Sequence, residues 1–522
     1  STYHHVPIDT VLVIEQPANA TPVVQATIMQ SASSLFIPLQ SNFDKHIEDD
    51  NVDFYYERNI PEMLSREGPK TAVGDVNGDG MEDIYIGGTQ GHPGQVYLQN
   101  SSGAFIKKKQ PGFDQYLDFE DVAVLFFDAD HDGDLDLFIG AGGNDHGPGS
   151  RELQHRLFKN DGKGNFTIDA AAFPLNNMNI SVAAANDFNH DGYVDLFVGG
   201  RSVPKEYGSS PSSYLYLNDG NGHFKDIAET KNPDIAHIGM VTGAVWANVS
   251  GDKSKELIIT GEWMATHIYS YTADHFVEVK SNLNNLFGWW QTVAAADLNG
   301  DGQEDLILGN IGENFYLHPD STHPVKLWMN DFNQNSTLDK VVTYTVDGKD
   351  KPVFLKREFT DQFPGLKKQN LKHADYALKS IQELFKKELL EKSVVKKFNF
   401  SSSIIALNKG NGNFTIEKLP PKLQLSSVNA VYATDINNDN KPDLVLGGNN
   451  FNFPPQFGRL DASYGDVLLN KGNAKFEWIP PVTSGIKLTG EIRDIKQITG
   501  NGKRYILVVR NDKIPVLYQI KN

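Results

Sequence analysis

Short apolar runs recur along most of the chain, and each follows a loop rich in acidic side chains. Examples are Ile84–Ile86, Leu137–Ile139 and Leu196–Val198, in which aromatic and β-branched residues dominate. A second apolar run follows each of these, then a turn rich in Asn and Gly, then a phenylalanine. Runs of this kind, separated by turn residues, are typical of antiparallel strands joined by hairpins. The pattern therefore predicts repeated units of four antiparallel strands.

The spacing of these units predicts an all-β fold, a seven-bladed β-propeller of four-stranded antiparallel blades. The last unit offers only three strands, around Ile492–Ile498, Arg504–Val509 and Ile514–Ile520. A closed ring needs a fourth strand, because an unpaired edge would stay exposed. The alternating segment Asp53–Arg58 directly precedes the first unit, so we expect it to complete the last blade and join the two ends of the chain.

Two segments depart from the repeat. Residues 1–52 contain β-favouring runs but no acidic loop, and we expect a small β appendage or the remnant of a preceding domain. Residues 53–522 form the propeller, with an insertion at about 330–400. Within the insertion, Leu371–Lys392 has apolar residues near helical spacing among many Lys and Glu, which predicts a helix on the propeller rim.

The acidic loops have the oxygen spacing of an EF-hand-like calcium loop shortened to nine residues. Asp75-Val-Asn-Gly-Asp-Gly-Met-Glu-Asp83 places side-chain oxygens at positions one, three, five and nine, and glycine at position six allows a sharp turn. Position seven contributes its main-chain carbonyl. Because clustered carboxylates repel one another without a cation, we expect five Ca²⁺ sites. Their ligands are Asp75, Asn77, Asp79, Met81, Asp83; Asp128, Asp130, Asp132, Asp134, Asp136; Asp187, Asn189, Asp191, Tyr193, Asp195; Asp297, Asn299, Asp301, Gln303, Asp305; and Asp435, Asn437, Asp439, Lys441, Asp443.

Two further loops keep only part of this pattern. The loop Asn248–Glu256 has Lys253 at the turn position, and we expect no calcium there. The insertion opens with Asp331, Asn333, Asn335, Thr337 and Asp339 at the ligand positions, but Ser336 replaces the glycine. The sequence leaves this sixth calcium site open.

Composition narrows the function classes. The formal net charge of −18 excludes a nucleic-acid partner, because phosphate binding needs a basic surface. No cysteine is present, which excludes disulfides, thiolate metal sites and cysteine nucleophiles, and favours a bacterial exterior over an animal secreted protein. Calcium loops of modest affinity are suited to the millimolar calcium found outside cells. No apolar run is long enough to span a membrane.

The face opposite the calcium loops is expected to bind a ligand. Its connections are long and rich in Gly, Asn and aromatic residues, a composition suited to a sugar, peptide or protein. The alternative is that its tryptophans pack between blades. The candidate contacts are Asn144, Arg201, Trp263, Trp289, Trp290, Asn310, Asn449, Arg459 and Asp461.

The sequence favours a protein without catalytic activity. It lacks the common nucleophile, phosphate-binding and zinc-protease motifs. Acids outside the metal loops, such as Glu262, Glu313 and Asp461, leave open a paired-carboxylate site for glycoside hydrolysis or elimination, but nothing in their spacing supports a pair.

The repeated motif Asp-x-Asn/Asp-x-Asp-Gly-x-x-Asp, followed by an apolar strand and Gly-Gly, resembles the FG-GAP/VCBS repeat family, which includes the integrin α-subunit head. The segments Leu64–Pro69, Gly199–Arg201, Gly288–Thr292 and Gly458–Gly465 are similar to bacterial members that resemble cartilage acidic protein. The resemblance implies calcium loops on one face of the ring and ligand contacts on the other. Those relatives are extracellular or outer-membrane surface proteins, often found with TonB-dependent transport systems.

From these observations we expect an extracellular, calcium-binding scaffold or binding module at a bacterial outer-membrane surface. Its partners are expected to be surface proteins such as an outer-membrane transporter, with a glycan or peptide as a further ligand. Two alternatives remain at this stage: a polysaccharide-active or glycan-binding protein that uses the loop-bearing face, and an adhesion domain of the integrin-head type.

Overall fold

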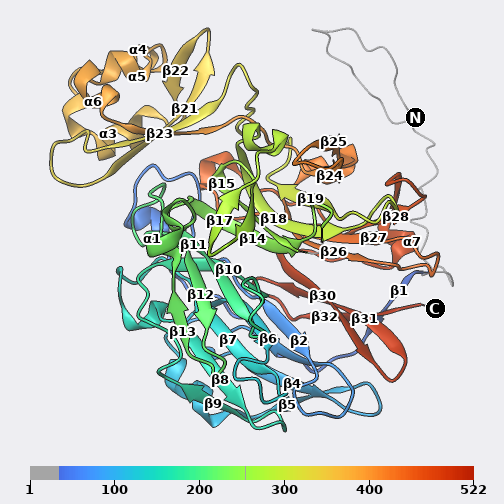
Figure 1. The fold of residues 1–522 in the computed structure, drawn as a ribbon. Helices are drawn as coiled ribbons and strands as arrows, with labels where there is room; N and C mark the ends of the chain where they lie inside the picture. Colours follow the sequence, from blue (N-terminus) through green and yellow to red (C-terminus); the bar gives the residue numbers. More distant parts are fainter. Residues whose placement is uncertain (1–33, 253, 522) are drawn as a thin grey trace, which may run out of the picture.

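The computed structural model describes residues 34–252 and 254–521, whose strands form seven four-stranded antiparallel blades around a central channel (Figure 1). Blade one comprises β2 (Thr71–Gly74), β3 (Asp83–Ile86), β4 (Gln95–Gln99) and β5 (Phe105–Lys108). Blade two comprises β6 (Asp121–Phe127), β7 (Asp136–Ala141), β8 (Arg156–Asn160) and β9 (Phe166–Asp169). Blade three comprises β10 (Asn179–Asn186), β11 (Asp195–Ser202), β12 (Tyr214–Asn218) and β13 (Phe224–Asp226). Blades four and five comprise β14 (Met240–Ala247), β15 (Glu256–Met264), β16 (His267–Thr272) and β17 (His275–Glu278); β18 (Gly288–Ala296), β19 (Asp305–Asn310), β24 (Ile404–Asn408) and β25 (Phe414–Lys418). Blades six and seven comprise β26 (Val428–Thr434), β27 (Asp443–Gly448), β28 (Asp466–Asn470) and β29 (Phe476–Ile479); β30 (Ile492–Gly500), β31 (Lys503–Arg510), β32 (Val516–Ile520) and β1 (Phe36–Leu39).

The first strand of every blade lines the central channel, which has a volume of about 210 Å³. Small residues such as Ala123, Ser181 and Gly243 face it, because seven inner strands converge on one axis. The apolar core lies between successive blades, where each sheet packs on the next. The predicted seven-bladed architecture is therefore confirmed.

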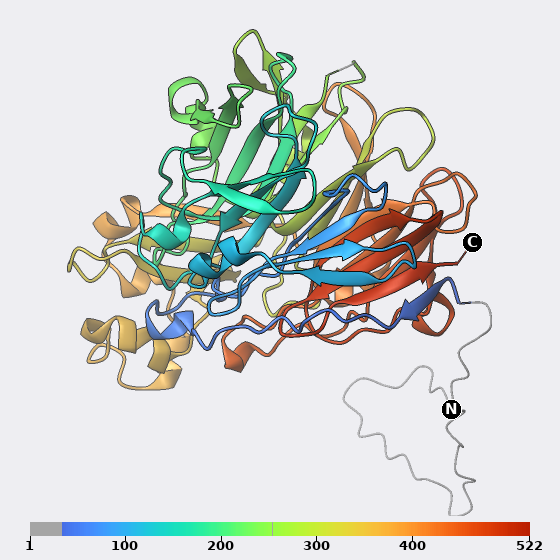
Figure 2. The same cartoon turned by 90° about the horizontal axis from the view of Figure 1, so that it is seen from below.

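The strand that closes the ring is β1, so the expectation that Asp53–Arg58 closes it is wrong. β1 pairs antiparallel with β32, with Phe36 opposite Ile520 and Leu39 opposite Leu517. Figure 2 shows blue β1 beside the red strands of blade seven. Asp53–Tyr55 instead forms a short 3-10 helix, η1. Its acidic residue serves as an anchor, since Asp53 Oδ2 accepts the Leu64 N–H at 2.6 Å.

Ring closure by β1 gives a direct stability prediction. Phe36 is fully buried between blades six and seven, whereas the adjacent Ile37 is 43% exposed on the other side of the strand. We expect Phe36→Ala to lower the free energy of unfolding by about 3–5 kcal/mol. Ile37→Ala, the matched control, should change it by about 0.5 kcal/mol or less. Urea denaturation measures both, and equal effects of the two substitutions would contradict closure by β1.

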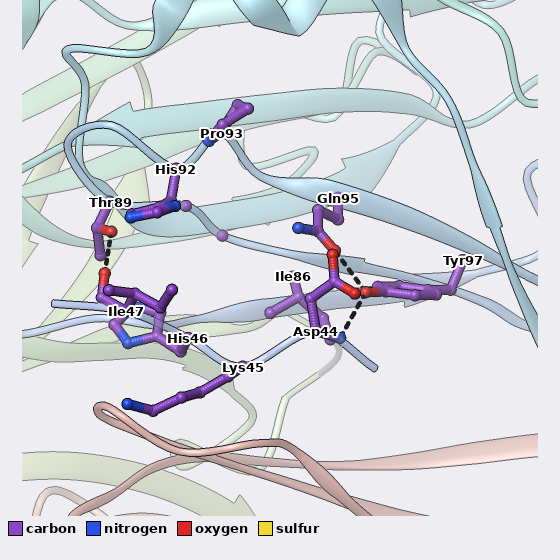
Figure 3. Close-up of a pocket in the computed structure, with 12 residues that line it drawn as sticks. Asp44, Lys45, His46, Ile47, Ile86, Thr89, His92, Pro93, Gln95 and Tyr97 are labelled. Carbon is purple, nitrogen blue, oxygen red and sulfur yellow. Dashed lines mark hydrogen bonds between the residues drawn. The ribbon is translucent and has the colours of Figure 1, made fainter. Parts of the chain in front are cut away.

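Residues 40–69, called the strap here, run from β1 across the propeller to β2 (Figure 2). They are part of the propeller structure, which corrects the expectation of a separate appendage at 1–52; the runs at 10–15 and 22–29 lie outside the described residues. The strap is bound to blade one around a small cavity of about 30 Å³ (Figure 3). There the Thr89 hydroxyl donates to the Ile47 carbonyl at 2.5 Å, and the Asp44 N–H donates to the Tyr97 hydroxyl at 3.0 Å.

The insertion lies between β19 and β24 of blade five and forms its own four-stranded sheet. Its strands are β20 (Val325–Asn330), β21 (Asp339–Val346), β22 (Lys349–Pro352) and β23 (Val394–Phe398), in the order β22-β21-β20-β23. Figure 1 shows this unit, yellow to orange, to one side of the blades. The inserted sheet therefore begins at Val325, earlier than the expected boundary at 330.

The single helix expected over Leu371–Lys392 is three short helices: α4 (His373–Ala377), α5 (Ile381–Leu384) and α6 (Lys387–Glu391). Ser380 starts a new helix through a capping box with Glu383, and Phe385 is extended. Leu371 and Leu378 are exposed, so the apolar residues of this segment do not form one continuous buried stripe. The helix α3 (Lys356–Gln362) was not predicted. Its Phe359 packs with Tyr376, Ile381 and Leu384 in a small core within the insertion.

The remaining helices are short connections between strands. They are α1 (Ala228–Lys231), α2 (Pro233–Ala236), α7 (Pro481–Ser484), η2 (Pro111–Tyr116), η3 (Arg151–Leu153), η4 (Asn282–Asn285), η5 (Pro364–Leu366), η6 (Pro421–Leu425) and η7 (Pro455–Phe457). Among the described residues, no helix has the length and apolar character needed to cross a membrane.

Candidate functional site: acidic loops and the opposite face

The five acidic loops with intact ligand spacing share one backbone geometry. The carboxylate at position one accepts the N–H groups of positions five and six; Asp75 accepts those of Asp79 at 3.2 Å and Gly80 at 2.7 Å. The same pair of bonds recurs in the loops that begin at residues 128, 187, 297 and 435. Positions four and six have positive φ in every one, including the non-glycine residues His131, His190, Asn438 and Asn440. The five loops therefore form the same tight turn around the carboxylate at position one.

The carboxylate at position nine is buried and joins each loop to its own blade. Asp83 Oδ2 accepts the Val76 N–H at 3.1 Å, and its Oδ1 accepts the Gln99 N–H from the third strand at 2.8 Å. Asp136, Asp305 and Asp443 make the same two bonds in their blades. Burial raises the pKa of Asp83 to about 7 and that of Asp136 to about 6.

An asparagine at the end of the third strand of blades two, three, five and six joins neighbouring blades, a role that the sequence analysis missed. Its side-chain amide donates to the position-two carbonyl of the preceding blade's loop. The bonds are Asn160 to Val76 at 2.8 Å, Asn218 to Ala129 at 2.9 Å, Asn408 to Val249 at 2.9 Å and Asn470 to Leu298 at 2.7 Å. The sequence signal was the recurring Asn after each third strand, which we interpreted only as part of a hairpin turn. The loops at 75–83, 128–136, 248–256 and 297–305 therefore determine the contact between two blades as well as the turn within one.

The donor set of these loops fits a hard cation. In the second loop, one carboxylate oxygen from each of Asp128, Asp130 and Asp136 lies within 4.8 Å of the others. Asp130 Oδ1 and, in the third loop, Asp195 Oδ2 are buried without a hydrogen-bond partner. Converging carboxylate oxygens, two of them without a donor, match the coordination that Ca²⁺ takes in proteins.

The loop Asn248–Glu256 satisfies its own polar groups. Glu256 replaces the aspartate at position nine, and its longer side chain accepts hydrogen bonds from the Val249 N–H at 2.9 Å and the Ser250 hydroxyl. The Asn248 amide donates to the Asp252 carbonyl. Groups that would face an ion are thus bonded to one another, which gives a physical reason for the prediction that this loop binds none.

In the insertion loop, Asp331–Asp339, the position-nine carboxylate is also hydrogen-bonded to side chains of the protein. Asp331 accepts the N–H groups of Asn335 and Ser336, as in the other loops. However, Asp339 Oδ1 already accepts the side-chain amides of Asn333 at 3.1 Å and Gln362 at 3.0 Å. Because amide N–H groups point at the position-nine carboxylate, this donor set fits a cation less well than the five intact loops do.

The residues expected to form a ligand-binding face are mostly interior. Trp263, Trp289 and Trp290 are at most 3% exposed, and the first two pack in a core shared by the propeller, the strap and the inserted sheet. Asn144, Arg201, Asn310 and Asn449 are also buried. The expected exposed surface is therefore corrected. The strap and the insertion cover this face, and the repeat pattern does not predict this cover because both segments lie outside the repeat.

Arg201 lies at the centre of a buried charge network on this face. Its guanidinium contacts Glu67 at 2.7 Å, Glu262 at 2.8 Å and Glu62 at 3.3 Å. The Trp289 indole N–H donates to Glu62 at 3.0 Å, and the Tyr207 hydroxyl donates to Glu262. Burial and the neighbouring Glu262 carboxylate raise the pKa of Glu62 well above its ordinary value. Since Glu62 and Glu67 belong to the strap, this network fixes the strap to the propeller.

Two of the predicted face residues stay accessible. Arg459 and Asp461 form an exposed ion pair at 2.8 Å, and the Arg459 guanidinium lies 4.5 Å from the centre of the Phe451 ring. Asn144, in contrast, donates to Asp53 and Glu57 of the strap. The structure thus brings Arg201, Trp263 and Trp289 together in one buried network and leaves Arg459 and Asp461 apart from it at the surface.

A family comparison decides what the repeated loops represent. The FG-GAP-like repeat model matches residues 75–139, 187–259 and 248–308. The chain carries FG-GAP-like repeats. The matches include five of the seven acidic or modified loops, and two of them, 187–259 and 248–308, span the self-satisfied loop of blade four. No curated protein matches the chain.

The solved structures that match this propeller are only distantly similar to it. They include the V. cholerae biofilm matrix protein Bap1 (10% identity, TM-score 0.37, 93% of this chain and 91% of that chain). The Dos1 propeller has 10% identity and a TM-score of 0.37, over 90% and 97% of the two chains. YCF48 bound to D1 peptide has 8% identity and a TM-score of 0.42, over 93% and 100%. We base no argument on likenesses this distant.

The accessible surface of the FG-GAP propeller includes an apolar groove that the sequence analysis missed. It has a volume of about 570 Å³ on blade six, between β28, β29 and α7. Tyr464, Trp478 and the run Pro480–Val482 line it, with Lys422 and Lys487. The Trp478 indole N–H donates to Asp466 at 2.9 Å, which fixes the ring. The sequence signal was the Trp-Ile-Pro-Pro-Val run after the last strand of that blade.

Proposed function

We propose that this FG-GAP propeller is an extracellular, calcium-binding scaffold or binding module without catalytic activity. The observation that carries the proposal is the shared backbone geometry of the five intact loops, together with three converging carboxylates in the second loop and two buried carboxylate oxygens that lack a donor. When bound, Ca²⁺ supplies the positive charge that these carboxylates lack and ties the first two strands of each blade together. Calcium loops of modest affinity are filled at the millimolar calcium concentrations found outside cells, which supports a location at a bacterial outer-membrane surface.

The groove on blade six is the surface that we propose for a protein partner. Its aromatic and proline side chains would bury apolar residues of the partner, and Trp and Tyr are common anchor residues in protein–protein contacts. Lys422 and Lys487 are cations in a chain whose net charge is −18, so they favour an occupant with a carboxylate. We therefore propose an extended, acidic segment of a surface protein, such as a transporter of a TonB-dependent uptake system.

The carboxylates considered for catalysis do not support an enzyme. Glu262 is fully buried against Arg201, Glu313 contacts Ser402 and Lys418, and Asp461 pairs with Arg459. A hydrolytic pair needs two carboxylates that face one substrate. Each of these three faces different partners, so they lend no support to glycoside hydrolysis or elimination.

Affinity capture tests the proposal. The immobilised chain is mixed with membranes of the source organism in millimolar calcium, and bound proteins are identified by mass spectrometry. We expect a stoichiometric outer-membrane protein that is lost in EGTA and weakened at least tenfold by Tyr464→Ala with Val482→Ser. Arg459→Ala, an exposed change away from the groove, is the control and should leave capture unchanged. Capture of soluble glycans in place of a membrane protein would contradict the scaffold role.

A further inference from the structure

The insertion differs in charge from the rest of the chain. Residues 325–398 contain 15 Lys and Arg against 10 Asp and Glu, which gives a net charge of +5. The whole chain carries −18, so the other residues together carry −23. Charge asymmetry of this kind within one chain indicates contact with a charged surface. An anionic surface would attract the insertion and repel the seven blades.

Unpaired positive charge of the insertion is gathered around α4. Four lysines lie within residues 367–379, namely Lys367, Lys368, Lys372 and Lys379. The only carboxylate of this segment is Asp375, and none of the four lysines forms an ion pair within the described part of the chain. In the inserted sheet, by contrast, Lys326 and Lys340 each contact a carboxylate, at 2.9 Å and 2.6 Å. The charges around α4 are therefore free to interact with another molecule.

Three leucines beside these lysines are exposed. They are Leu355, Leu371 and Leu378, with exposed fractions of 61%, 78% and 71%. Leu371 and Leu378 lie on either side of α4 in the sequence. The two neighbours of Leu355 in the chain are bonded to this segment. The Tyr376 hydroxyl of α4 donates to the Phe354 carbonyl at 2.8 Å, and Lys356 Nζ donates to the Leu371 carbonyl at 3.2 Å. Figure 1 shows α4 on the side of the insertion away from the blades.

These leucines do not form the core of the insertion. That core consists of side chains such as Phe359, Tyr376 and Ile381, which are at most 6% exposed. A single exposed leucine is common on protein surfaces. Three exposed leucines among unpaired lysines are instead the composition of surfaces that lie on membranes. There, apolar side chains enter the headgroup region while ammonium groups contact the anionic headgroups.

We propose that this surface, called the α4 surface here, binds a membrane with anionic lipid headgroups. It consists of Leu355, Leu371, Leu378, Lys367, Lys368, Lys372 and Lys379. The type of cation favours lipid over an acidic protein, because 14 of the 15 basic residues in the insertion are lysines. Lysine is a flexible point charge that suits a diffuse anionic surface, whereas contacts between proteins are enriched in arginine and depleted in lysine.

Contact through the α4 surface would orient the propeller on the membrane. The blades carry the negative charge of the chain, so repulsion directs them away from the headgroups. This contact goes beyond the groove proposed for a protein partner on blade six, because no residue that lines the groove belongs to the insertion. The two proposals can therefore fail separately.

Vesicle flotation tests the α4 surface. The full chain in calcium is mixed with vesicles of phosphatidylglycerol and phosphatidylcholine in equal parts, and the bound fraction is measured against lipid concentration. We expect binding to these vesicles, none to vesicles of phosphatidylcholine alone, and loss of binding in about 0.5 M sodium chloride. Lys367→Gln with Lys368→Gln should weaken binding at least tenfold, and Leu371→Ser at least fivefold.

Matched controls change the same residue types on the blades. Leu175→Ser removes a leucine that is 86% exposed, between β9 and β10. Lys109→Gln with Lys225→Gln removes two exposed lysines that form no ion pair among the described residues. Both controls should bind the vesicles as tightly as the wild type.

Three results would overturn the proposal. No flotation of the wild type would leave the lysines to an acidic protein partner. Equal binding of the wild type and the α4-surface variants would assign flotation to calcium bridges between the acidic loops and the headgroups. Binding that is lost in the lysine variant but kept in Leu371→Ser would show that any polyanion serves as well as lipid. No other protein is present in the assay, so its result does not depend on the groove.

Discussion

Removal of calcium with EGTA is expected to lower the melting temperature of the protein by on the order of 10 °C. A ligand present at 100 times its Kd stabilises a folded protein by about 2.7 kcal/mol for each site that only the native state forms. Each of the five intact loops carries at least three aspartates, and the loops at 75–83, 128–136 and 297–305 also determine contacts between blades through Asn160, Asn218 and Asn470. Loss of the ions leaves these carboxylates facing one another, so several blade contacts weaken together.

Differential scanning calorimetry in calcium, in EGTA and after restoration of calcium measures this effect. Mg²⁺ serves as the control cation, because its strict octahedral geometry and short ligand distances suit these loops poorly, and it should restore little of the lost stability. An identical melting curve with and without EGTA would contradict the calcium assignment.

Substitution of Arg201 by methionine is expected to lower the free energy of unfolding by about 3–5 kcal/mol. Arg201 is 2% exposed and is the shared partner of Glu62, Glu67 and Glu262. Its removal leaves three carboxylates in the interior without the cation that they surround. Because Glu62 and Glu67 belong to the strap, we expect the strap to become sensitive to proteolysis as well.

Arg459→Met is the matched control for Arg201→Met. Arg459 also pairs with a carboxylate, Asp461, at 2.8 Å, but both side chains are exposed. Exposed pairs of this kind contribute about 0–1 kcal/mol, so the control should retain nearly all of its stability in urea denaturation. Equal stability of the two variants would contradict a structural role for Arg201 and return it to the set of ligand contacts.

The parts of the fold that repeat could be predicted from the sequence. The positions and oxygen content of the loops follow from residues such as Asp75 and Asp83, and the glycine predicted to allow the sharp turn, Gly80 in the first loop, has a positive φ. Local chemistry determines these features, because a nine-residue turn and its adjacent strand depend on residues close in sequence. The same reasoning separated Asn248–Glu256 from the intact loops, and the bonds of Glu256 give the physical reason.

The parts that do not repeat could not be predicted. Trp289 has the composition of a ligand contact, but its indole donates to Glu62, more than two hundred residues away, and the strap covers it. The alternation at Asp53–Arg58 suggested a strand, yet its acidic residues are tertiary anchors; Glu57 pairs with Lys340 of the inserted sheet at 2.6 Å. Contacts between segments that occur once leave no period in the sequence. Two covering segments, the strap and the insertion, therefore place the predicted site in the interior.

The measurement that tests the central claim most directly is anomalous diffraction from crystals grown in calcium. The account predicts an anomalous peak within each loop at 75–83, 128–136, 187–195, 297–305 and 435–443, and none at 248–256. Peaks absent from the five intact loops, with their carboxylates hydrogen-bonded to water alone, would contradict it.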